Sequence, residues 1–167
     1  TIGDTGITVI PQLLDFSGAS AGQIMFPATQ NASADANTLD DYEEGSWTPT
    51  ITFGGASAGQ TYSSQTGIYV KFGKVVLAFY SAIFSNNGSS TGNALLTGLP
   101  FTINANAYGA SSFKYYVGLS AAGYPVFDLT GSGTTAGMSF GTATGITTMT
   151  DTNITNSGGF VGCLTYT

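Results

Sequence analysis

The chain has 167 residues, of which 7% are charged, 42% are hydrophobic and 13% are aromatic, with 24 glycines among them. Disordered chains lack bulky apolar groups, so this composition indicates a folded, β-rich protein. A net charge of −6, with no histidine and only three cations, excludes a histidine-based catalytic triad and argues against a nucleic-acid partner, since Lys and Arg hold phosphate backbones.

Residues 1–45 read as an extended segment that would form a neck or shaft. Their short apolar fragments are separated by Gly and Pro and cannot enclose a core alone. We expect either several copies wound together, which is favoured, or a flexible linker. Residues 38–44 have the pattern of one helical turn, a cap residue followed by acids. Seven of the nine acids lie before residue 46, so the charge break predicts two regions, 1–45 and 46–167.

From Ser46 onward, apolar runs alternate with turn residues such as Gly54-Gly55 and Asn86-Asn87-Gly88. The expected strands cover residues 47–53, 67–72, 75–84, 93–99, 112–120, 124–129, 137–141 and 159–166. Short strands at this spacing, without a helical period, predict an all-β fold: an antiparallel β-sandwich with a jelly-roll-like connection.

The run 75–84 is apolar on both of its faces. Successive strand residues point to opposite sides, so one face holds Val75, Leu77 and Phe79 and the other holds Val76, Tyr80 and Phe84. One face would meet the sandwich core, and a neighbouring subunit is the simplest cover for the other. We expect Val76, Tyr80 and Phe84 to form that subunit interface.

Acidic residues at the junction are the group with the clearest chemical potential. They are weak candidates for calcium ligands, because their spacing is not that of an EF-hand loop, and weaker candidates for the carboxylates of sugar hydrolysis. These residues are Asp40, Asp41, Glu43 and Glu44. The favoured interpretation is an acidic turn that contacts Lys71 or Lys74 of a neighbour. No metal, cofactor or catalytic residue is therefore expected.

Candidate ligand residues lie in loops, where an aromatic ring beside amides suits a sugar. They are Asn86, Asn87, Asn104, Asn106, Tyr108 and Tyr124. Cys163 has no histidine to activate it and reads as a small buried hydrophobe. No apolar run reaches the roughly 20 residues of a membrane helix, so membrane insertion is not expected.

Several motifs resemble the C-terminal part of bacteriophage tail fibres and tailspikes. The resemblance begins at residues 23–30 and in an acidic junction at 39–49, which contains Trp47. It continues with a Gly-x-Tyr strand, tight turn and apolar strand at 67–76, and with residues 97–102 and 160–166. The resemblance implies a homotrimer, a β-rich distal domain and attachment to a bacterial surface glycan or outer-membrane receptor. It supplies no catalytic set.

Three functions remain open at this point. The first is a receptor-binding tip at the distal end of a virion tail fibre or tailspike, which is not an enzyme. The second is a C-terminal trimerisation cap of a larger polysaccharide-degrading tailspike. The third is a glycan hydrolase within this chain, which a lack of cleavage of capsule or lipopolysaccharide would exclude.

Overall fold

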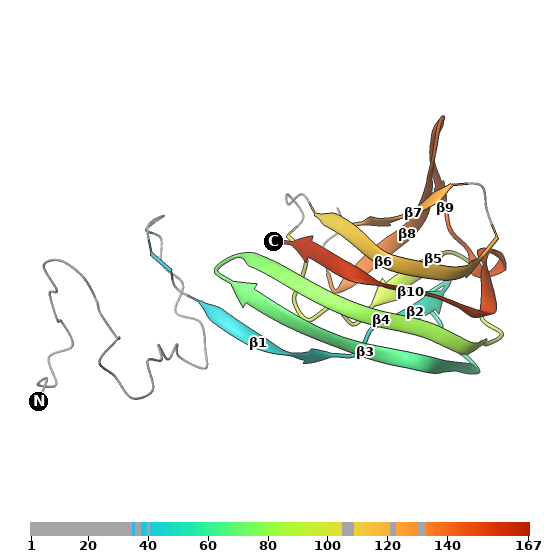
Figure 1. Cartoon of the computed structure of the whole chain (residues 1–167), viewed down its shortest axis with the longest axis horizontal. Helices are drawn as coiled ribbons and strands as arrows, with labels where there is room; N and C mark the ends of the chain where they lie inside the picture. The colour runs from blue at the N-terminus through green and yellow to red at the C-terminus, as the bar shows by residue number, and fades with distance from the viewer. Residues whose placement is uncertain (1–34, 36–37, 40, 105–108, 121–122, 130–132) are drawn as a thin grey trace, which may run out of the picture.

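The computed structural model describes residues 35, 38–39, 41–104, 109–120, 123–129 and 133–167 (Figure 1). Of the neck segment expected over residues 1–45, residues 1–34, 36–37 and 40 lie outside them. The strands of the described part are β1 (Tyr42–Trp47), β2 (Thr50–Phe53), β3 (Gln60–Phe72), β4 (Val75–Asn87), β5 (Ala94–Thr97), β6 (Ala110–Leu119), β7 (Tyr124–Asp128), β8 (Thr135–Thr142), β9 (Gly145–Thr148) and β10 (Ile154–Tyr166). One 3₁₀ turn, Asp151–Asn153, accompanies them, and the described residues contain no α-helix.

The strands form two antiparallel sheets, which Figure 1 shows as two layers. Sheet A has the order β1-β3-β4-β10-β6, and sheet B has the order β2-β5-β8-β7 with β9 beside β8. In each sheet a late strand separates two earlier ones: β10 lies between β4 and β6, and β8 lies between β5 and β7. The predicted all-β, antiparallel class is confirmed, and the layers are compatible with a β-sandwich.

The core lies between the sheets and determines which face of β4 points inward. Val76, Tyr80 and Phe84 are at most 4% exposed, and with Ala78 and Ala82 they belong to the core cluster. The prediction that these three residues form a subunit interface is therefore wrong. Their large and small side chains alternate, and such alternation lets two facing layers interdigitate.

Two glycines make room for the aromatic rings of this core. A Cβ at Gly67 would collide with the indole of Trp47, whose Nε1–H donates to the carbonyl of Phe79 at 3.1 Å. A Cβ at Gly162 would lie 3.1 Å from the hydroxyl of Tyr80 and still closer to the carbonyl oxygen of Ser112. The rings of Trp47 and Tyr80 then meet at a centroid distance of 6.4 Å.

The first strand begins earlier than the sequence indicates. The expected strand 47–53 is two strands in different sheets, because the chain changes layer at Thr48-Pro49 and proline has no N–H for a ladder. The helical turn expected up to Glu44 is also wrong, since Tyr42–Trp47 pairs with β3 throughout. The expected region boundary at 45/46 consequently falls inside β1.

Candidate functional site

Sheet A turns an apolar surface away from the core, which we call the open face. It consists of the outward side chains of the five strands, with β3, β4 and β10 in the middle and β1 and β6 at the edges. The most exposed members are large: Ile68 is 62% exposed, and Phe72, Val75, Leu77 and Phe79 are between 37% and 57% exposed. Register places Ile68 beside Phe79 and Phe79 beside Cys163, so the apolar side chains form continuous rows.

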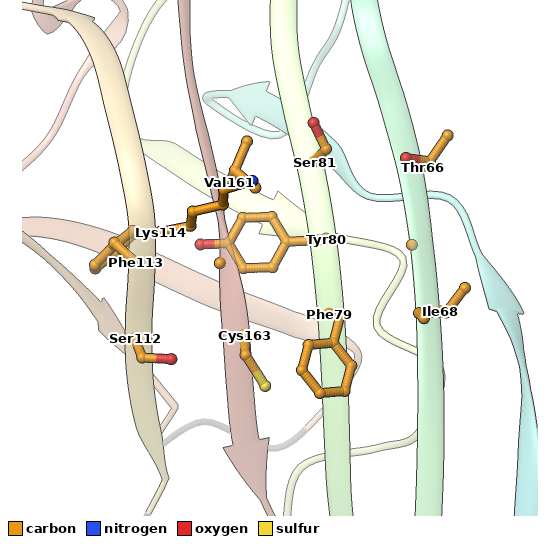
Figure 2. A pocket seen from close by; sticks show the side chains of 12 residues that line it. Thr66, Ile68, Phe79, Tyr80, Ser81, Ser112, Phe113, Lys114, Val161 and Cys163 are labelled. Carbon is orange, nitrogen blue, oxygen red and sulfur yellow. The ribbon is translucent and has the colours of Figure 1, made fainter.

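A hollow of about 590 Å³ lies in the middle of the open face (Figure 2). Its lining comes from β3, β4, β10 and β6, and includes Ile68, Phe79, Cys163 and Ser112. Lys114 of β6 is the one charged residue of that lining. The hollow is thus an apolar depression with a single cation at its side.

Tyr80 lies between this hollow and the core. Figure 2 shows its ring reaching from β4 across β10. Its hydroxyl is buried and has no hydrogen-bond partner among the described residues. Burial, with a smaller contribution from Cys163, raises the pKa of Tyr80 far above the ordinary value, so the group stays protonated and neutral.

Cys163 lines the hollow and is half-buried rather than buried as expected. Its Sγ lies 3.5 Å from the carbonyl oxygen of Leu164. Burial raises the pKa of the thiol, which lowers the thiolate fraction at neutral pH. A neutral thiol on an apolar floor contributes packing rather than nucleophilic chemistry.

The acidic junction forms contacts within the chain instead of a solvated turn. Asp41 makes a partly buried ion pair with Lys71. Glu43 accepts a hydrogen bond from the hydroxyl of Tyr69 at 2.5 Å, which raises the pKa of that tyrosine. The expectation that the acidic turn contacts Lys71 of a neighbour is therefore wrong, because Lys71 forms its ion pair with Asp41 of the same chain.

The two glutamates of β1 cannot act as one site. They are successive strand residues, so Glu43 and Glu44 point to opposite faces of sheet A. Glu44 accepts a hydrogen bond from the hydroxyl of Tyr42 at 2.9 Å on the side of the open face. Asp40 lies outside the described residues, and among those described no three acidic, cysteine or histidine side chains are grouped to hold a metal.

Most of the described ligand candidates have structural contacts. The Asn86 Oδ1 accepts from the backbone N–H of Gly88 at 2.9 Å, and the Asn87 Nδ2 donates to the carbonyl of Ile154 at 2.8 Å. The backbone N–H of Asn104 donates to Thr167. Asn106 and Tyr108 lie outside the described residues.

Tyr124 differs from these residues because its ring is available. It begins β7 and is 62% exposed, on the outer face of sheet B. A Cβ at Gly141 would lie 2.5 Å from its Cζ, so the ring rests against the glycine backbone of β8. Ile146 of β9 pairs with the same glycine and is 73% exposed. Tyr124 is thus an exposed aromatic platform held by backbone.

Comparisons with protein-family models, with curated proteins and with solved structures found no match. No helix in the described part of the chain has the length and hydropathy needed to cross a membrane.

Sequence reasoning did not single out Ile68 or Lys114 as site residues. The alternation within 67–72, where Ile68, Val70 and Phe72 share one face, was the available signal for the first of them. Nothing in the sequence marked Lys114, because its place beside the hollow depends on the pairing of β6 with β10.

Proposed function

We propose that this chain is a non-catalytic adhesion module at the distal end of a phage tail fibre or tailspike, which assembles as a homotrimer and binds a bacterial surface glycan. The open face of sheet A is the observation that supports assembly into a homotrimer. The resemblance of residues 23–167 to tail-fibre C-terminal regions supports a location at the end of a tail fibre or tailspike. Attachment through three chains would multiply weak single contacts.

A second copy of the chain suits the open face because that face lacks charge. The side chains that β3, β4 and β10 place there are apolar, hydroxyl or thiol groups, without Lys, Asp or Glu. Two such faces can meet without burying an unpaired charge, which would cost several kcal/mol. Contiguous exposed apolar surface of this kind commonly marks protein contacts.

The glycan would bind on the other layer, at Tyr124. Sheet B lies behind sheet A, so its outer face stays accessible when sheet A is covered (Figure 1). The apolar C–H face of a sugar packs on an aromatic ring, and hydroxyl side chains then bond its oxygens. Ser139 and Thr148 pair with each other two residues from Gly141 and would supply such groups.

The trimerisation cap of a larger polysaccharide-degrading tailspike is the second candidate. The engagement of Asn86 and Asn87 in structural hydrogen bonds favours it, because it leaves fewer polar groups for a ligand. A trimerisation cap requires the open face for assembly but does not require an exposed Tyr124 for glycan binding.

An array of bacterial capsule and lipopolysaccharide glycans separates the candidates. The adhesion module predicts binding to at least one glycan, lost in Tyr124→Ala and kept in Asn86→Ala, with the mass of the assembly unchanged. An assembled protein that binds none of them supports the cap and contradicts adhesion to glycans. Shortened chains after incubation with the bound polysaccharide would contradict the non-catalytic part of the proposal.

A further inference from the structure

We infer that the hollow on the open face receives strand β1 of a neighbouring copy, with Tyr42 in the hollow and Glu44 against Lys114. This inference rests on the proposed assembly and specifies its contact. It makes the site composite, since the floor comes from one copy and the occupant from the next.

Opposite charges at the two edges of sheet A are the first argument. On the open face, β1 carries Glu44 and β6 carries Lys114, while the three strands between them are uncharged there. Four strand spacings separate the two edges, which is about 19 Å at 4.7–4.9 Å per step. The two charges therefore cannot pair within one chain, and a second copy brings them together.

Lys114 is suited to such a partner. Lys114 is exposed, and it takes part in no ion pair with the described residues of its own chain. The ion pair found among those residues joins Lys71 to Asp41. Excluding water from the apolar hollow beside it would strengthen its attraction to a carboxylate. Glu44 has one oxygen bonded to Tyr42 and a second oxygen that remains able to accept from Lys114.

Size and polarity of the hollow are the second argument. Cavities of about 300–1,000 Å³ hold drug-sized molecules, so a space of about 590 Å³ accommodates one tyrosine ring with part of its strand. Tyr42 is 41% exposed, and its register with Phe72 places it on the open face. Its ring would lie on apolar side chains such as Ile68 and Phe79.

In a trimer each contact between β1 of one copy and the hollow of the next is heterologous, and it must close to a ring to avoid an open filament, whereas a two-fold dimer would make the same Glu44–Lys114 pair twice across one interface. Three copies close it in the proposed assembly. The Glu44–Lys114 pair then repeats at each interface.

A charge-swap series tests the contact with the full chain. Glu44→Lys and Lys114→Glu each place like charges together, and we expect each to raise the assembly midpoint about tenfold or more in a sedimentation dilution series. The double variant restores opposite charges and should return to within about threefold of the wild type. Lys74→Glu, in the exposed β3–β4 turn, is the matched control and should leave the midpoint unchanged.

Reaction of Cys163 with a maleimide gives a second measurement, because this one cysteine lines the hollow. The single variants should react faster than the wild type, and the double variant should react as slowly as the wild type. Both substituted side chains are exposed, so near-UV circular dichroism should match across the series.

The outcomes separate this inference from the proposed function. The inference is overturned, and the proposed trimer is not, if the assembly midpoint is the same in all three variants. The same holds if the single variants raise the midpoint and the double variant does not restore it. A wild-type monomer at micromolar concentration overturns both. A dimer that obeys the charge swap keeps the contact and contradicts the trimer.

Discussion

Replacement of Phe79 by serine tests whether the open face is buried in the native protein. Phe79 is 42% exposed in the single chain. Burying a whole phenylalanine side chain contributes roughly 1.5–3 kcal/mol, so covering its exposed fraction contributes about 0.6–1.3 kcal/mol per copy. Over three copies this is about 2–4 kcal/mol, and because the half-assembly concentration of a trimer varies as the square root of its dissociation constant, that concentration should rise about five- to thirty-fold.

A dilution series followed by sedimentation velocity measures that concentration. Ile146→Ser is the matched control, because Ile146 is an exposed apolar residue of sheet B and its loss should leave the midpoint in place. An unchanged midpoint in Phe79→Ser would refute the reasoning, since the face would then contribute nothing to assembly.

Three further predictions concern the fold within one chain. Gly67→Ala should lower the free energy of unfolding by about 1–3 kcal/mol through the collision with the indole of Trp47; urea denaturation measures this, and a neutral result would contradict the packing. Asp41→Ala should cost about 3 kcal/mol or more by leaving Lys71 unpaired, and adding Lys71→Met should recover part of it in the same assay. Burial raises the pKa of Tyr166 from 10.0 to about 12, so the native chain keeps a proton that the unfolded chain loses. Stability should therefore fall as pH rises from 10 toward 12, and Tyr166→Phe should flatten part of that slope; an identical slope in thermal melts would contradict the assignment.

The sequence identified most strands because apolar runs between turn residues follow the period of a pleated strand. It could not decide the orientation of β4. Alternation shows which residues share a face, but both faces of Val75–Phe84 are apolar, and the position of sheet B determines which is buried. The small residues Ala78 and Ala82, which alternate with Val76, Tyr80 and Phe84 along the strand, were the available sign of the packed face.

The acidic junction was misread because local preference and tertiary pairing disagree there. Acids after a cap residue favour a helix start, yet Tyr42–Trp47 has β3 as a complete partner. The strand β9 was missed since all four of its residues are exposed and it has no apolar alternation. Among the described ligand candidates Asn86, Asn104 and Tyr124 are exposed, and the exposure of Tyr124 agrees with its place beside Pro125 and a turn.

The mass of the native protein in multi-angle light scattering tests the central claim most directly. If sister chains cover the open face of sheet A, micromolar protein should elute as one species of three times 17.0 kDa. A stable species of 17.0 kDa that keeps its sheet structure would contradict the claim, because the apolar face would then be exposed to water in the native state.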